Sequence, residues 1–195
     1  MLQNPIQLRL EKLEPWQHIT FMAALVERMY PNYAAFCQQT DFAEPQAFRN
    51  LLDAVWEIMT VKTAKINFEN QLEKLEELIP NTEDYDIYLI YPAVDACVSM
   101  STLIHTLLDR DLMMESVLKI SQQSVASVAQ LEEAQTGVEV TNENQKENEA
   151  VCAEWDVQWE IFRALKDAES RDIELIRGIR NELREDGVSN LGLSL

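Results

Sequence analysis

Cys97, Ser101 and His105 recur at intervals of four residues, and a Cys or Ser beside a His is the usual arrangement for nucleophilic catalysis. On a helix the three side chains would share one face within about 12 Å along its axis. No orienting carboxylate or oxyanion donor can be named for them. The sequence therefore favours a small polar seam in a helix interface, with His105 satisfied by a backbone group or by a carboxylate such as Asp109.

Two Tyr-Pro pairs suggest a second kind of site. Tyr30-Pro31 and Tyr91-Pro92 are each interpreted as the end of one helix and the start of another, because proline lacks an N–H and favours the first helical turn. Asp95 would lie in the first turn after Pro92, where the helix dipole favours a carboxylate, so capping alone explains it. The functional alternative is a small polar-aromatic pocket at the breaks, lined by Tyr30, Tyr33, Tyr91, Asp95 and His105.

Metal and phosphate chemistry lack the residues they need. Di-iron bundles use Glu-x-x-His, but Pro15 stands three residues before His18 and Thr102 three residues before His105. The first glycine is Gly137, which excludes a phosphate-binding glycine loop from the first two thirds of the chain. The sequence predicts no metal site, no cofactor and no catalytic residue.

Trp155 and Trp159 stand four residues apart, so a helix would place both on one side, on a stripe continued by Phe162 and Leu165. The first interpretation is that the tryptophans anchor this helix in the core. The second is that they form a patch that binds a partner protein.

The elements that position these residues are predicted to be helices only. The chain has four glycines, and its six prolines all lie at or before Pro92, several where a helix would begin. The expected fold is all-α, a single-domain bundle of about seven helices over residues 1–195. Predicted helix starts are Asn4-Pro5, Glu14-Pro15, Glu44-Pro45 and Tyr91-Pro92.

Apolar spacing fixes the later elements. Residues 92–108 are apolar nearly all round and are expected to form the central helix. A helix over 112–135 should end at Gly137, followed by an exposed, mobile polar connection over 138–149. The stripe over 151–183 predicts a long C-terminal helix, or two end to end, with Gly178 as its weak point.

Charge and cysteine content bound the function. With 34 acidic and 16 basic residues the net charge is −18, which repels phosphate backbones and anionic lipids. The longest stretch without a formal charge, 96–108, is too short to cross a bilayer, and the charged N-terminus does not resemble a signal peptide. Three widely spaced cysteines fit reduced thiols. We therefore expect a cytoplasmic protein that binds neither nucleic acid nor membranes.

Four stretches carry a family resemblance. They are MYPNYAAFCQQT (29–40), YPAVDAC (91–97), EWDVQWEIF (154–162) and the opening MLQNPIQLRLEKLEPWQHITFMA. With them the chain resembles the YjaG-like family of bacterial proteins of unknown function over nearly its whole length. The resemblance implies an α-helical fold and a gene-neighbourhood association with histidine kinases. It implies no established activity and no catalytic residues.

The leading functional expectation is a non-enzymatic cytosolic interaction or regulatory protein with a protein partner. A histidine-kinase pathway is implied by the resemblance alone, since neither His18 nor His105 has the adjacent basic and small residues of a phospho-accepting histidine. The alternative is a small-molecule-binding sensor or enzyme with a pocket near the Tyr-Pro helix breaks. An enclosed pocket with convergent polar groups would favour the alternative, and a broad apolar patch the interaction protein. The oligomeric state stays open.

Overall fold

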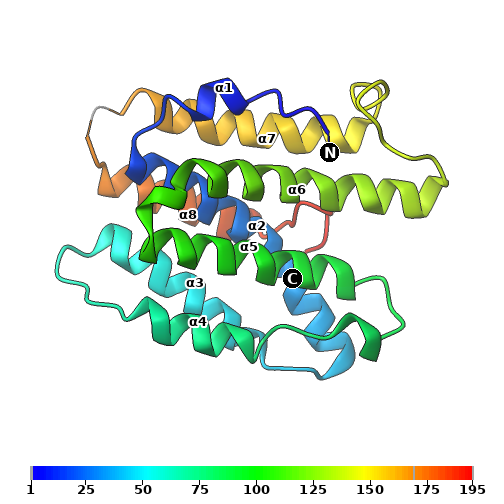
Figure 1. The fold of residues 1–195 in the computed structure, drawn as a ribbon, viewed down its shortest axis with the longest axis horizontal. Coiled ribbons are helices and arrows are strands. Elements are labelled where there is room, and N and C mark those ends of the chain that lie inside the picture. Colours follow the sequence, from blue (N-terminus) through cyan, green and yellow to red (C-terminus); the bar gives the residue numbers. More distant parts are fainter. Residues whose placement is uncertain (1, 169, 195) are drawn as a thin grey trace.

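The computed structural model describes residues 2–168 and 170–194. The described chain is all-α, as predicted, and only Val188 and Ser194 form an isolated antiparallel bridge. Its eight α-helices and two 3₁₀ helices are α1 (Gln7–Leu10), α2 (Pro15–Thr40), α3 (Pro45–Thr60), α4 (Phe68–Glu76), η1 (Thr82–Asp84), α5 (Ile90–Leu108), η2 (Arg110–Leu112), α6 (Met113–Thr136), α7 (Glu149–Lys166) and α8 (Ile173–Asp186). Figure 1 shows α6 and α7 side by side, with α5 across the middle of the molecule.

Several helix boundaries follow from single residues. Pro15 and Pro45 are the first residues of α2 and α3, where a missing N–H costs nothing. The Asn67 side chain caps α4 by accepting a hydrogen bond from the Asn70 N–H at 3.0 Å. Gly137 ends α6 in the left-handed region with φ 72°, as expected for a glycine stop.

The central helix is α2, and the prediction that residues 92–108 would be central is wrong. α2 packs against α3, α5, α6, α7 and α8, and nearly all of its residues from Gln17 to Cys37 are buried. α5 leaves Tyr91, His105 and Leu108 exposed. The start of α2 at Pro15 was predicted, but apolar patterning missed its central position because some of its buried residues are polar and have partners elsewhere in the chain, as Gln17 does with the Leu165 carbonyl.

Pro31 does not break a helix, which corrects the interpretation of Tyr30-Pro31. It lies inside α2, which continues for nine more residues to Thr40. An interior proline removes one helical hydrogen bond and costs about 3 kcal/mol. Burial of Met29, Tyr33 and Phe36 on the same helix offsets this cost, because each fully buried side chain of this size contributes roughly 1.5 to 3 kcal/mol.

The C-terminal stripe forms two helices, α7 and α8, rather than one long helix. α7 ends at Lys166 and α8 begins at Ile173, so the helices are not divided at Gly178. The Asp172 side chain starts α8 by accepting a hydrogen bond from the Leu175 N–H at 3.0 Å. Buried Ile176 and Ile179 hold the helix across Gly178.

Two adjacent charged residues of α2 form ion pairs with different helices. Glu27 accepts hydrogen bonds from Arg49, from Trp56 Nε1 at 2.8 Å and from Arg184 Nε at 3.1 Å, so it joins α2 to α3 and α8. Arg28 pairs with Glu154 of α7 at 2.9 Å. Burial raises the pKa of Glu154, although Arg28 and the Ser124 hydroxyl act in the opposite direction.

The last turn of the described chain also docks on α2. Asn190 donates its backbone N–H to the Arg28 carbonyl at 3.3 Å and accepts from Asn32 Nδ2 at 2.8 Å. Its own amide donates to the Ser124 carbonyl of α6 at 2.9 Å. Residues 188–194 thereby add polar contacts to the central helix. In the part of the chain that the structure describes, no helix is long and apolar enough to cross a membrane.

Candidate functional site

Tyr30 and Tyr33, two of the predicted pocket residues, lie in the α2–α3 interface. Both rings pack on Phe48, with centroids 5.9 and 4.8 Å away. The Arg49 guanidinium covers the Tyr30 ring at 3.8 Å. Burial raises the pKa of Tyr33 far above its ordinary range. These two side chains are packed parts of the core.

Tyr91, Asp95 and His105 lie on α5, where the structure spreads them apart. Tyr91 is 53% exposed and His105 is also exposed. Their separation of fourteen residues corresponds to about 21 Å along the helix, too far for one small pocket. α5 begins at Ile90, so Asp95 lies beyond its first turn and the interpretation of Asp95 as a helix cap is wrong. Asp95 instead accepts a hydrogen bond from the Ser127 hydroxyl of α6 at 2.6 Å. The two pockets described below are lined by other residues.

Burial raises the pKa of Asp95 above its ordinary value, while the bonds with Ser127 and Gln123 oppose the shift. Where the group is ionised in both states, a raised native pKa means that the carboxylate destabilises the fold. Asp95→Asn keeps an oxygen for Ser127, so we expect it to increase the free energy of unfolding at pH 8. The increase over the parent should shrink as the pH falls below the raised pKa of Asp95 and vanish below the ordinary pKa of an aspartate. Urea titrations of both proteins at several pH values measure it, and a difference that does not change with pH would contradict the expectation.

Cys97, Ser101 and His105 are not brought together for catalysis. Cys97 is buried and its Sγ contacts the Leu78 carbonyl at 3.5 Å, whereas His105 faces solvent. Burial raises the pKa of the Cys97 thiol far above its ordinary value, which suppresses the thiolate that a nucleophile needs. Among residues 2–168 and 170–194, no group of three or more His, Cys, Asp or Glu side chains could hold a metal ion.

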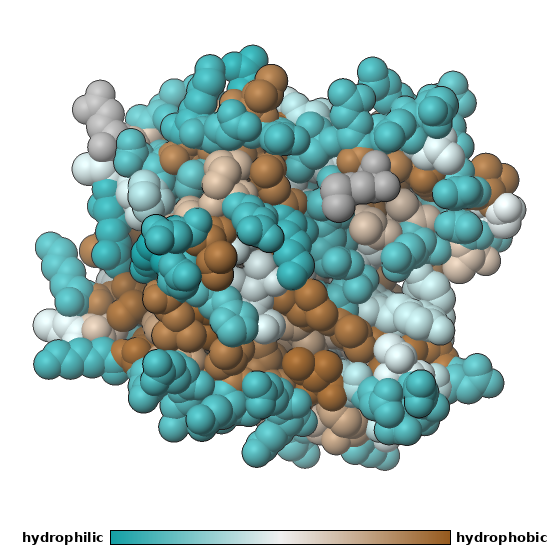
Figure 2. Space-filling view, in the orientation of Figure 1, coloured by the Kyte–Doolittle hydropathy of each residue, from teal (hydrophilic) through white to brown (hydrophobic). Residues whose placement is uncertain are grey.

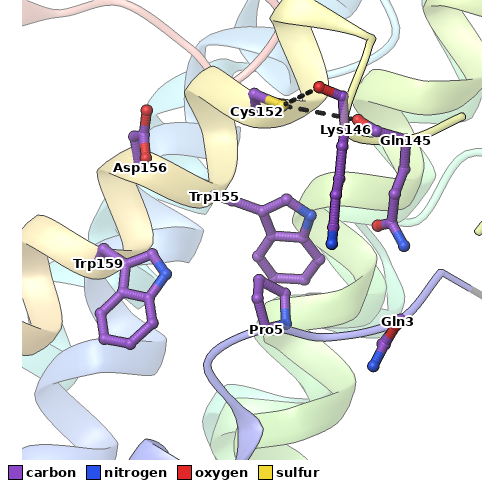
Figure 3. Close-up of a pocket in the computed structure, with 8 residues that line it drawn as sticks. All are labelled: Gln3, Pro5, Gln145, Lys146, Cys152, Trp155, Asp156 and Trp159. Atoms are coloured by element: carbon purple, nitrogen blue, oxygen red, sulfur yellow. Dashed lines mark hydrogen bonds between the residues drawn. The ribbon is translucent and has the colours of Figure 1, made fainter.

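One pocket, of about 300 Å³, gathers aromatic and polar side chains on α7, and we call it the tryptophan pocket. Residues at helical spacing on α7 form one wall, and the N-terminal segment and the 138–148 connection form the others (Figure 3). It is lined by Gln3, Pro5, Gln145, Lys146, Cys152, Trp155, Asp156 and Trp159. A second pocket, of about 380 Å³, lies at the start of α8 around Lys62 and Arg171.

Hydrogen bonds hold the walls of the tryptophan pocket together. The Asn148 side chain caps α7 by accepting from the Val151 N–H at 2.9 Å. Cys152 Sγ contacts the carbonyls of Gln145 and Lys146 at 3.6 and 3.5 Å. The Gln3 N–H donates to Asn142 Oδ1 at 2.6 Å, which ties the N-terminal segment to the connection.

Much of the connection predicted to be exposed and mobile is thus folded into bonded turns. Most of its residues are exposed or half-buried, but Gln145 is buried. Its backbone N–H donates to the Thr141 carbonyl at 2.9 Å, and its side chain donates to Asn142 Oδ1 at 3.2 Å. Two residues of this polar connection, Gln145 and Lys146, therefore line one wall of the pocket.

The indole Nε1–H of Trp155 is a buried hydrogen-bond donor in the pocket. Trp155 is 6% exposed, and its Nε1–H has no hydrogen-bond partner among the described residues. In Figure 3 this nitrogen lies on the side of the ring that faces Lys146 and Gln145. A buried donor left without an acceptor costs about 1 to 3 kcal/mol, so a bound acceptor here would be stabilising.

The two ends of the pocket differ in charge. Figure 3 shows Lys146 and Asp156 on opposite sides of Trp155, with Trp159 at the Asp156 end. Trp159 is half-buried, packs edge-on against Phe162 at 5.8 Å and lies 5.9 Å from the Arg163 guanidinium. The pocket can therefore take a hydrogen-bond acceptor at the Lys146 end and an apolar body against the rings.

Residue spacing predicts the side chains of α7 that form one wall of the pocket, but not those of the other walls. Four-residue spacing correctly placed Trp155 and Trp159 on one side of a helix, with Trp155 more deeply buried. Gln3 comes from a segment far away in the chain, and Gln145 and Lys146 come from the turns just before α7. Nothing in their local pattern signals a pocket, because they are common surface residue types in polar stretches.

Comparisons with known proteins give a consistent family assignment but no activity. A family described as "Protein of unknown function (DUF416)" matches residues 5–194. "Uncharacterized protein YjaG" of Salmonella typhimurium is 58% identical over 194 residues, covering 100% of this chain and 98% of that protein. YjaG of Escherichia coli is also 58% identical, over 193 residues, covering 99% and 98% of the two chains. An uncharacterized Haemophilus influenzae protein is 48% identical over 193 residues, with 98% of each chain covered.

A solved structure shares the fold. The crystal structure of a DUF416 family protein from Shewanella baltica superposes with a TM-score of 0.91 at 29% sequence identity, covering 99% of this chain and 100% of that one. The names of these relatives do not mention a histidine kinase, so the predicted signalling association stays a prediction.

Proposed function

The chain belongs to DUF416, a family of proteins of unknown function, and we propose that it is a cytosolic, non-catalytic protein that binds a small carboxylate ligand in the tryptophan pocket. The observation that carries the proposal is the buried, unpartnered Nε1–H of Trp155 beside the Lys146 side chain. This replaces the predicted location of a pocket at the Tyr-Pro pairs with one on α7.

Size and lining support a small organic molecule. Ligand pockets usually begin at about 300 Å³ and combine apolar or aromatic walls with a few directed polar groups. This pocket has the volume of a small pocket, about 300 Å³, and two tryptophans supply the aromatic walls. Trp155 Nε1 and Lys146 supply two donors at one end. A carboxylate joined to an aromatic or aliphatic body matches both features.

The contacts of Cys152, the one cysteine that lines the tryptophan pocket, favour a binding role over catalysis. General acid–base or nucleophilic chemistry needs a group within hydrogen-bond reach of the reacting atom, held by a third residue. Cys152 contacts two backbone carbonyls, and no base is hydrogen-bonded to it in the described chain. The contacts of Cys152 therefore support recognition rather than nucleophilic catalysis in the proposed role.

Phenylacetate is a suitable probe, with phenethylamine as its cationic counterpart. We expect phenylacetate to quench tryptophan fluorescence saturably. Trp155→Phe should weaken its binding roughly 10- to 100-fold, because a hydrogen bond to a charged group contributes about 1.5 to 3 kcal/mol. Phenylalanine keeps an aromatic ring in the wall, so the change isolates the lost Nε1–H.

Two matched variants complete this test. Trp16→Phe changes a half-buried tryptophan away from the pocket and should leave the affinity unchanged. Lys146→Gln should weaken phenylacetate binding, whereas Lys119→Gln, an exposed lysine on α6, should not. Stronger binding of phenethylamine than of phenylacetate, or an unchanged affinity in Trp155→Phe, would refute a carboxylate site.

A further inference from the structure

A row of side chains along the outer face of α5 has the spacing of a helix-packing seam. The residues alternate at intervals of three and four, which is the a and d pattern of a heptad. We call this row the α5 seam: Tyr91, Val94, Val98, Ser101, His105 and Leu108. It extends over about 26 Å at 1.5 Å per residue, the length of a helix of about five turns.

The α5 seam lies at the surface. Tyr91 is 53% and Leu108 44% exposed, His105 is exposed, and Val94, Val98 and Ser101 are half-buried. The opposite face of α5 packs on α2, α4 and α6. Figure 2 shows apolar residues gathered over the region of α5 and α4, bordered by hydrophilic ones. Other residues of α5 make most of its internal contacts, although Val94 also touches the core and Tyr91 packs edge-on against Tyr88 at 6.0 Å.

The acidic residues around the α5 seam favour a basic partner. From Phe68 to Lys119 the chain has eleven acidic residues and three basic ones. Exposed Glu69, Glu73 and Glu76 lie on α4, which packs beside α5. Asp95 lies between the seam and α6, and Asp109 and Asp111 follow its C-terminal end. A helix with lysine or arginine beside its apolar stripe would meet opposite charges along this border.

From this spacing, exposure and charge we infer that the α5 seam docks an amphipathic, basic helix of a protein partner. A second copy of this chain is a poor occupant, since each copy has a net charge of −18 and would place an acidic border against an acidic border. The inference is independent of ligand binding in the tryptophan pocket, which lies on α7.

A designed peptide provides the test. The probe is a fluorescein-labelled helical peptide of about three heptads, with leucine at a and d and lysine at the flanking positions. Its control is a scrambled peptide of the same composition that lacks the heptad spacing. At 150 mM salt we expect anisotropy to show micromolar binding of the probe and binding at least 10-fold weaker for the scrambled peptide. Equal binding of the two peptides would reduce the interaction to net charge and overturn the inference.

Variants of the full chain locate the binding surface. Val98→Glu at the centre of the seam and Tyr91→Ala at its exposed start should each weaken probe binding at least 10-fold. Leu8→Glu, at a 71% exposed leucine of α1, should not change it. Circular dichroism confirms folding of each variant, and Tyr91→Ala keeps the test decisive if Val98→Glu fails to fold. Full affinity in Tyr91→Ala would overturn the inference.

Two further outcomes decide the occupant. Sedimentation of the parent should show a monomer, and a dimer abolished by Val98→Glu would assign the seam to a second copy instead. Trp155→Phe should bind the peptide as tightly as the parent does. With this variant, loss of phenylacetate binding and retention of peptide binding distinguish failure of one proposal from failure of the other.

Discussion

Glu27→Ala is expected to lower the free energy of unfolding by about 3 to 5 kcal/mol, the cost of breaking a buried ion pair by removing one partner. The Glu27 side chain is 2% exposed, and Arg49, Trp56 and Arg184 all donate to it. The substitution leaves the Arg49 guanidinium and the Trp56 indole N–H without their acceptor, whereas Arg184 keeps its pairing with Asp53 at 2.6 Å. Domains of this kind have about 5 to 15 kcal/mol in total, so the variant should unfold early in urea.

An exposed ion pair provides the matched control. Glu174 and Arg177 pair at 2.9 Å across one turn of α8, and the Glu174 side chain is 81% exposed. Glu174→Ala should change the free energy of unfolding by no more than about 0.5 kcal/mol, because solvent screens the pair. If chemical denaturation gives the two variants the same midpoint, the bonds of Glu27 with Arg49, Trp56 and Arg184 do not hold α2, α3 and α8 together.

Trp155→Ala is expected to cost about 3 to 5 kcal/mol of stability, through lost transfer energy and the cavity that remains. The side chain is buried and belongs to the hydrophobic core. Chemical denaturation again measures the effect. A midpoint equal to that of the parent would show that this face of α7 does not anchor the fold and would favour a partner-binding patch.

Trp159→Ala is the natural comparison for this prediction. Trp159 is half-buried and packs against the edge of the core. Its removal should cost clearly less than that of Trp155, because less apolar surface leaves contact with the protein. The pair of variants therefore separates the structural role of each tryptophan, while Trp155→Phe separates structure from ligand binding.

The helices themselves could be predicted from short-range chemistry. Four helix ends are set by single residues, because each of these acts on its own turn of backbone, independently of the rest of the chain. They are Pro15, Pro45, Asn67 and Gly137. The same local rule gave the wrong answer at Pro31. There the packing of a helix buried on nearly all sides outweighs one missing hydrogen bond.

The candidate site was predictable only on the α7 side. Trp155 and Trp159 share a helical face by their spacing. Gln3, in contrast, reaches the pocket only through the course of the chain in three dimensions, and Lys146 reaches it through the bonded turns before α7. The buried charges Glu27 and Arg28 were also missed. Their one available signal is position, since they interrupt an otherwise apolar stretch of a helix, and identifying their partners requires the fold.

The docking of residues 188–194 on the central helix has a consequence for biosynthesis. Asn32 leaves the ribosome 158 residues before its partner Asn190. At about 5 to 20 residues per second, the interval is roughly 8 to 30 seconds. During translation α2 therefore exists without its contacts to Asn190 until residues 188–194 have been made, so this part of its polar surroundings is added last among the described contacts of Asn32 and Arg28.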